Sequence, residues 1–156
     1  MRRSSLRGRR QQKVHFARTL AHNLSMSTTN PLAKPLHILV ADDNAVNLRL
    51  ATRILRDMGH TGALVTDGVK ALKALDAQRF DVVLLDVTMP EMDGLQVLRS
   101  LRELEQRGRP KTAVIMVTAH DLPSDRMNLL AAGADGFVPK PLEAGALASE
   151  LARVLR

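Results

Sequence analysis

Two unbroken apolar runs, at 82–85 and 113–117, constrain the fold of this chain more than any other feature. Strands of this kind are buried on both faces, which happens when helices cover both sides of a parallel sheet. Around them, strand-like and helix-like periodicities alternate along the chain. We expect strands at 36–41, 62–65, 80–86, 112–117 and 136–138, and helices at 45–58, after Asp67, at 93–105, at 123–132 and around Leu147, Leu151 and Val154. The pattern predicts an α/β fold with a doubly wound, parallel, five-stranded sheet.

Polar residues stand at the ends of four of these strands. Asp42 and Asp43 follow the first strand, Asp86 ends the third, Thr118 follows the fourth and Lys140 follows the fifth. Because ligands of such sheets bind beyond the carboxyl ends of the strands, we expect these side chains in one crevice. Three carboxylates and one lysine leave an excess of negative charge, which a hard divalent cation such as Mg²⁺ would neutralise.

The same side chains could carry out phosphoryl transfer. This chemistry needs a nucleophilic oxygen, a metal ion and donors that neutralise the phosphoryl oxygens. Asp86 can act as the nucleophile and form an aspartyl phosphate, while Lys140 and the Thr118 hydroxyl hold the oxygens. After Asp86, Pro90 ends the pairing of the strand, and we expect Gly94 to let the loop turn into the next helix.

Four sequence blocks in this order resemble the receiver domain of two-component response regulators. They are ADDN at 41–44, LLDVTMPEMDG at 84–94, VTA at 117–119 and GADGFVPKP at 133–141. The resemblance covers about 36–156 and implies a flavodoxin-like (βα)₅ fold. It also implies a phosphorelay switch that accepts a phosphoryl group from a sensor histidine kinase or a histidine phosphotransfer protein. Such a switch is no enzyme beyond its own phosphorylation and dephosphorylation.

The resemblance implies a role for each matching residue of the crevice. Asp86 would be the phosphoacceptor and Lys140 would pair with the phosphoryl group, with the Lys140–Pro141 bond in the cis form. Mg²⁺ would be bound by Asp43 directly, by Asp42 through water, by Asp86, and by the backbone carbonyl of Thr88.

The resemblance also implies a way for the signal to leave the site. Thr118 and Phe137 would form a switch that remodels the face made of the fourth helix, the fifth strand and the fifth helix. A downstream protein would dock on that face, and we expect no DNA-binding domain. Thr88 and His120 would tune the lifetime of the aspartyl phosphate.

Simpler structural interpretations exist for the same residues. Asp42 and Asp43 could cap the helix that starts near residue 45. Asp86 could be a turn residue at the end of a strand, which is what we expect for Asp81. Thr118 could be an ordinary strand residue and Phe137 an ordinary core residue. His120 could be a solvated surface histidine.

Alternatives from other function classes remain open. An aspartyl-phosphate phosphatase would need a second acid two residues after the nucleophile, and position 88 is threonine. The stretch DDNAVN at 42–47 is reminiscent of receivers in hybrid histidine kinases, so the chain could be a module of such a kinase. A phosphorylation-independent scaffold is the third possibility, although it would not need the intact acidic cluster.

The net charge of +7 comes from the N-terminal segment. Residues 1–25 hold seven Lys and Arg and no acid, whereas the rest of the chain holds 16 basic and 16 acidic residues. We expect 1–35 to be a disordered basic tail and linker, and 36–156 to be the receiver domain. The true start of the protein could be Met26, in which case residues 1–25 would not belong to it. Alternatively, the tail could be a native arm that binds anions or directs targeting, or it could be the remnant of a longer chain.

Composition excludes several classes of site and partner. The chain has no cysteine, so it has neither a disulfide framework nor a thiolate metal site. It has no Trp or Tyr on which nucleic-acid bases could stack, and residues 26–156 carry no excess positive charge. No apolar run is long enough to span a membrane, and we expect a cytoplasmic protein.

Overall fold

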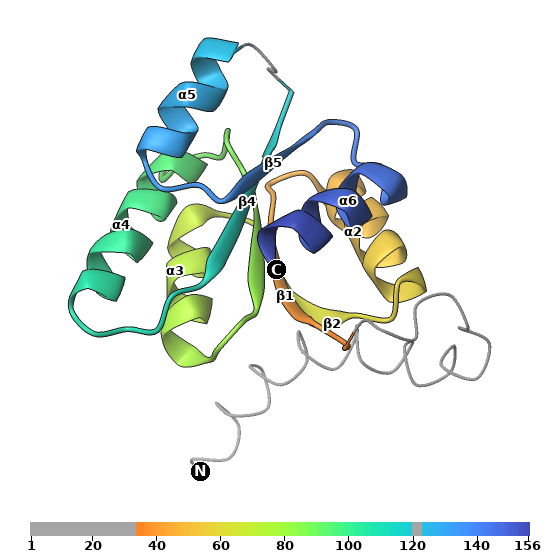
Figure 1. Cartoon of the computed structure of the whole chain (residues 1–156), viewed down its shortest axis with the longest axis horizontal. Helices are drawn as coiled ribbons and strands as arrows, with labels where there is room; N and C mark the ends of the chain where they lie inside the picture. The colour runs from red at the N-terminus through yellow and green to blue at the C-terminus, as the bar shows by residue number, and fades with distance from the viewer. Residues whose placement is uncertain (1–33, 120–122) are drawn as a thin grey trace.

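A central parallel sheet lies between two layers of helices (Figure 1). This computed structural model describes residues 34–119 and 123–156. The strands are β1 (His37–Ala41), β2 (Thr61–Val65), β3 (Val82–Asp86), β4 (Ala113–Thr118) and β5 (Gly136–Pro139). The helices are α2 (Ala45–Asp57), α3 (Gly68–Ala77), α4 (Gly94–Gln106), α5 (Pro123–Ala131) and α6 (Ala144–Val154). The strand order β2-β1-β3-β4-β5 reverses direction at β1, which places a ligand crevice beyond the ends of β1 and β3.

Both faces of the sheet are buried, as the unbroken apolar strands predicted. Leu39, Val83 and Met116 face the layer of α3, α4 and α5, whereas their neighbours Ile38 and Leu84 face α2 and α6. This alternation follows from the two-residue period of a strand. The predicted fold class is confirmed.

The helices that follow β1, β2 and β3 begin at side-chain caps. Asn44 caps α2, and Asp67 and Asp93 cap α3 and α4. The start of α3 directly after Asp67 was predicted. The alternative that Asp42 or Asp43 caps α2 is wrong, because the Asn44 side chain accepts the first free N–H groups of the helix.

Most element boundaries lie within one or two residues of the predicted ones. The largest difference on the sheet is that β3 begins at Val82 and not at residue 80. At this end the Asp81 carboxylate, rather than a strand carbonyl, accepts the His37 N–H at 2.8 Å. Phe80 is buried and stacks on the His37 ring, with 4.7 Å between centroids. Among the described residues, no helix has both the length and the apolar character needed to cross a membrane.

Candidate functional site

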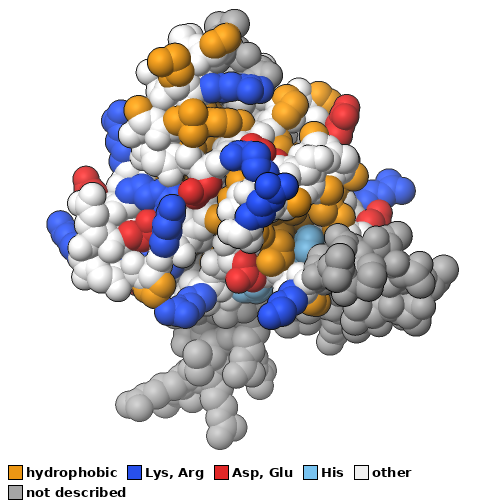
Figure 2. All heavy atoms as spheres, in the orientation of Figure 1, with side chains coloured by type: hydrophobic (Ala, Val, Ile, Leu, Met, Phe, Trp, Pro, Cys, Tyr) orange, Lys and Arg blue, Asp and Glu red, His pale blue; other side chains and the backbone are white. Residues whose placement is uncertain are grey.

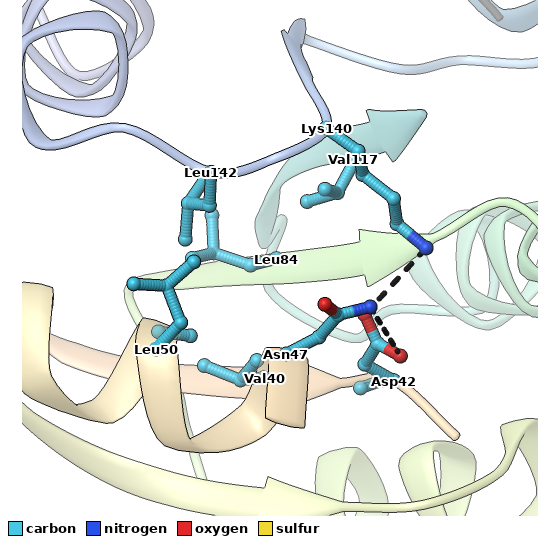
Figure 3. Close-up of a pocket in the computed structure, with 10 residues that line it drawn as sticks. Val40, Asp42, Asn47, Leu50, Leu84, Val117, Lys140 and Leu142 are labelled. Carbon is cyan, nitrogen blue, oxygen red and sulfur yellow. Dashed lines mark hydrogen bonds and ion pairs between the residues drawn. The ribbon is translucent and has the colours of Figure 1, made fainter. Parts of the chain in front are cut away.

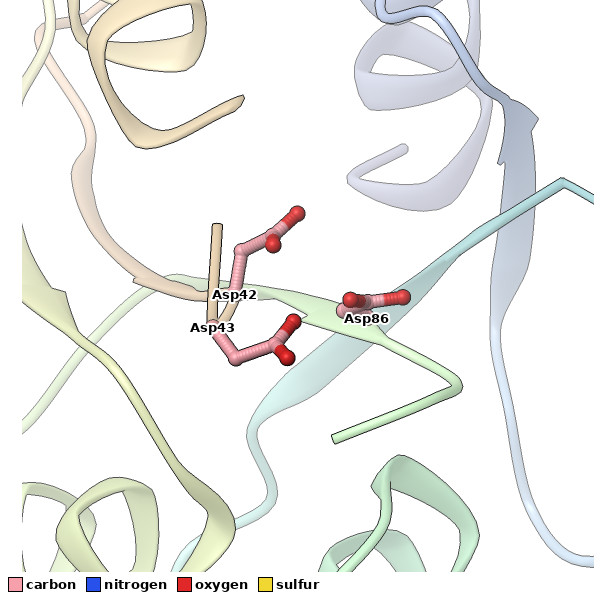
Figure 4. Close-up of side chains that lie close together, drawn as sticks. All are labelled: Asp42, Asp43 and Asp86. Atoms are coloured by element: carbon pink, nitrogen blue, oxygen red, sulfur yellow. The ribbon is translucent and has the colours of Figure 1, made fainter. Parts of the chain in front are cut away.

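Three carboxylates meet where β1 and β3 end (Figure 4). Asp42 directly follows β1 and Asp86 is the last residue of β3, and these two strands are neighbours in the sheet. One oxygen from each of Asp42, Asp43 and Asp86 lies within 4.8 Å of the others. Asp42 and Asp86 are buried, with 5% and 3% of their surface exposed, whereas Asp43 is exposed. The structure thus brings together the three acids that the sequence placed in one crevice.

Lys140 reaches this cluster from the end of β5. Its Nζ lies 2.8 Å from Asp86 Oδ1 and 3.7 Å from Asp42 Oδ2. Figure 3 shows its side chain extended toward Asp42 and Asn47. The Lys140 backbone N–H donates to the Thr118 carbonyl, and the Lys140–Pro141 bond is cis as expected.

The two oxygens of Asp86 differ in their surroundings. Oδ1 accepts hydrogen bonds from Lys140 and from the Thr88 N–H at 3.2 Å, whereas Oδ2 is buried and has no partner among the described residues. Burial raises the pKa of Asp86, the Lys140 hydrogen bond opposes this shift, and the charge of Asp42 adds to it. A buried carboxylate oxygen without a donor is costly, and a bound cation or phosphoryl group would satisfy it.

The donor set fits magnesium. Mg²⁺ prefers hard oxygen ligands and is usually bound through a few carboxylates, with water completing its shell. Asp42, Asp43 and Asp86 supply such oxygens, and Oδ2 of Asp86 is a ligand atom to which no described part of the chain donates.

Two asparagines that the sequence analysis did not single out surround Asp42. The Asn44 N–H donates to Asp42 Oδ1 at 2.9 Å, and Asn47 Nδ2 lies 3.5 Å from the same atom. The signal was present in the sequence as DDNAVN, where Asn44 directly follows the two acids and Asn47 comes three residues later.

Gly94 is required beside Asp86 for a different reason from the predicted one. A Cβ at Gly94 would lie 2.2 Å from the Asp86 carbonyl oxygen, so glycine allows the loop to approach the strand end closely. The left-handed backbone of this loop is instead at Glu91, with φ of 64°.

The two residues expected to form a switch lie on neighbouring strands. Thr118 ends β4 and is buried, and Phe137 lies on β5, half-buried against the layer of α3, α4 and α5. In the strand register Phe137 is opposite Met116, and alternation along β4 places Thr118 on the same face as Met116. Thr88 is exposed beside Asp86. His120 lies outside the described residues.

The family model of the response regulator receiver domain matches residues 38–152. The chain belongs to this family. The resemblance on which the sequence analysis relied is confirmed, and the chain is a receiver domain of two-component signalling.

Receivers of several parent proteins are similar to this one. Sensor protein GacS of Pseudomonas syringae pv. syringae is 37% identical to this chain. The matched segment covers 71% of this chain and 12% of GacS. Response regulator MprA of Mycobacterium sp. (strain KMS) is 38% identical over 78% of this chain, which covers 51% of MprA. The chain therefore spans about half or less of these curated relatives.

A solved structure adds a relative with a bound metal. The receiver domain of sensor histidine kinase PA1611 from Pseudomonas aeruginosa PAO1 has magnesium coordinated in its active-site cleft. It is 31% identical, with a TM-score of 0.69, over 79% of this chain and 100% of that domain.

Proposed function

We propose that this receiver domain is a phosphorylation-operated switch whose phosphoacceptor is Asp86. The observation that carries the proposal is the buried Asp86 carboxylate, with Oδ1 held by Lys140 at 2.8 Å and Oδ2 without a partner among the described residues. The end of β3 places the Asp86 carboxylate beside Asp42, Asp43 and Lys140.

The proposed reaction uses the side chains of this cluster together with the Thr118 hydroxyl, which would donate to a phosphoryl oxygen. An Asp86 carboxylate oxygen forms a bond to phosphorus while the bond between phosphorus and the donor's nitrogen or oxygen breaks, and the electron pair leaves with the donor. Water later attacks phosphorus, which releases phosphate and restores the carboxylate. Throughout, the Lys140 ammonium neutralises charge on the phosphoryl oxygens.

Asp42, Asp43, Asp86 and the backbone carbonyl of Thr88 would hold Mg²⁺. When bound, this ion supplies the positive charge that the acidic cluster lacks and that an incoming phosphoryl group requires. The three carboxylates would then be ionised together at lower cost than in its absence.

The surface of α5, β5 and α6 would carry the signal to a downstream protein. It corresponds to the fourth helix, fifth strand and fifth helix of the sequence analysis, and Thr118 and Phe137 lie beneath it. On α5, Met127 and Leu130 are 69% and 53% exposed. Figure 2 shows hydrophobic side chains gathered over this helix, in the upper part of the view. Apolar surface of this kind suits a protein contact.

The phosphoryl donor would be a sensor histidine kinase or a histidine phosphotransfer protein. Similarity to GacS and to the PA1611 receiver supports a place in kinase-linked relays, whereas similarity to MprA supports a response regulator context. Thr88 and His120 would tune the lifetime of the phosphorylated form.

Intact mass after incubation with acetyl phosphate tests the proposed nucleophile. The wild-type chain should gain one phosphoryl mass only in the presence of Mg²⁺, and Asp86→Asn should gain none. Asp81→Asn is the matched control, because Asp81 precedes the same strand at its opposite end, where it accepts the His37 N–H. Normal labelling of Asp86→Asn would refute the assignment.

A further inference from the structure

The outer edge of β5 is held by a carboxylate of α6. Among the described strands β5 pairs with β4 alone, so its outward N–H groups have no partner in those strands. The outward Phe137 N–H donates instead to Glu150 Oε2 at 2.6 Å, and Pro139, the next outward residue, has no N–H. Glu150 therefore takes the place that a neighbouring strand would occupy at this residue.

The backbone beside Phe137 is shaped for this contact. A Cβ at Gly136 would lie 2.6 Å from Glu150 Oε2 and 2.9 Å from Val154 Cγ2, so only glycine leaves room for the carboxylate. Arg153 orients Glu150 through Nε–Oε1 and Nη2–Oε2 contacts of 2.7 and 3.0 Å. The same Arg153 Nη2 donates to the Asp135 carbonyl at 2.9 Å, so one ion pair of α6 holds the start of β5.

The Phe137 ring has a charged neighbour on α5. The Arg126 guanidinium carbon lies 5.9 Å from the ring centroid, within cation–π range. The pKa of Glu150 is lowered by the Arg153 hydrogen bond above all, and also by the Phe137 N–H and the charge of Arg126. Glu150 is therefore ionised at neutral pH, and its hydrogen bond to Phe137 is charge-assisted. Through Phe137, α5 and α6 are both connected to β5.

We propose that Glu150 is a positioning residue that latches β5 to α6 in the conformation seen here, and so sets how readily Asp86 phosphorylation moves Phe137. The inference rests on the proposed function. An interaction that forms in only one of two conformations shifts the equilibrium toward that conformation, by the free energy that the interaction contributes there. The latch, defined as Glu150 with Arg153, opposes the conformation that the phosphoryl group favours. Weakening it releases the switch.

The affinity for beryllium fluoride with Mg²⁺, a phosphoryl mimic, tests the latch. By isothermal titration, Glu150→Ala should bind about tenfold more tightly than wild type, because the resting conformation has lost a charge-assisted hydrogen bond. Glu150→Gln retains a hydrogen-bond acceptor but loses the charge, so its affinity for the mimic should lie between those of wild type and Glu150→Ala. The matched control is Glu143→Gln, which removes a charge from the exposed residue that directly precedes α6 and makes no side-chain capping bond.

The direction of the change separates a latch from a merely structural contact. Both Glu150 variants should unfold at lower urea concentration than wild type and yet bind the mimic more tightly. A contact that only stabilises the fold would leave binding unchanged or weaken it.

Amide hydrogen exchange at Phe137 provides a second readout. Protection of the Phe137 N–H should fall when wild type is saturated with the mimic, and it should already be low in Glu150→Ala. Failure of wild type to bind the mimic would overturn the proposed function and this inference with it. Binding by wild type with equal or weaker binding by both variants would overturn the inference alone, as would unchanged protection of Phe137 on saturation.

Discussion

The burial of Asp86 affects both the proposed chemistry and the stability of the fold. It is 3% exposed, one of its oxygens lacks a partner among the described residues, and its pKa is raised by burial. Perturbed carboxylates of this kind gather at reactive sites, where stability is lost for the sake of reactivity. Lys140 offsets part of the cost, and we expect a bound cation to offset more.

Asp86→Asn should therefore increase the free energy of unfolding at pH 7.5 in EDTA, because it removes a carboxylate whose pKa burial raises. The raised pKa means that ionised Asp86 is less favourable in the folded than in the unfolded state. This penalty is complete above the folded pKa and shrinks as pH falls toward the ordinary value of 3.8. Urea denaturation at several pH values measures it, and Mg²⁺ should stabilise wild type more than the variant. A variant that is clearly less stable at pH 7.5 would show that the Lys140 ion pair dominates.

His60 gives the fold a dependence on pH of the opposite sign. Its side chain is 4% exposed, and Nδ1 accepts the Leu36 N–H at 3.0 Å, so the neutral ring is the bonded form. Burial lowers the pKa of His60, against a smaller opposing effect of Asp81. Below pH 6.5 the unfolded chain binds a proton that the folded chain does not, so stability should decline as pH falls.

His60→Asn tests this dependence because the amide oxygen can accept the same N–H. The contribution of His60 between pH 6.5 and 5 cannot exceed about 2 kcal/mol, the limit for one proton over that range. Urea midpoints across this range should fall less steeply for the variant than for wild type. Parallel curves would exclude His60 as the cause.

At the level of secondary-structure elements, charged side chains connect segments that the sheet alone does not hold. Arg102 of α4 donates to Thr112 O at 2.8 Å at the entry to β4, and to Gly133 O at 3.0 Å beyond α5. It also pairs with Glu105 and with Asp135, at 2.7 and 2.8 Å. This network fixes α4 against the starts of β4 and β5, at the end of the sheet opposite to the acidic cluster.

Arg102→Met should destabilise the fold by about 3 kcal/mol, because it leaves two partly buried carboxylates without their main partner. The control is Arg99→Met, which removes an exposed arginine on the preceding turn of the same helix. Urea denaturation of both variants measures the difference. A loss for Arg102→Met no larger than the control's would show that Lys111, 3.4 Å from Asp135, and solvent replace the arginine.

At the level of the whole molecule, the five parallel strands bring distant segments to one edge. Asp42 and Lys140 are separated by almost a hundred residues and lie 3.7 Å apart because β1 and β5 end at the same side of the sheet. Helices on both faces of the sheet cover the two parts of the core.

A chain of residues 34–156 should therefore fold alone. We expect its free energy of unfolding to equal that of the full chain within about 0.5 kcal/mol, the usual range for changes outside packed structure. Its labelling by acetyl phosphate should proceed at the same rate. Urea denaturation and timed intact-mass measurements check both. A loss of stability well beyond this range would show that the N-terminal segment packs on the domain.

The amino-acid sequence alone determined the sheet, its buried strands and the meeting of Asp42, Asp43, Asp86 and Lys140. Periodicity reports burial, and in a parallel sheet every strand ends at the same edge, so residues at strand ends must converge. The tertiary structure decided which side chains touch. Hydrophobic periodicity in the sequence indicates neither the hydrogen bond from the Phe137 N–H to Glu150 nor the contacts of Arg102. Such contacts depend on the distance between packed elements, which side-chain volumes set only once the helices lie against the sheet.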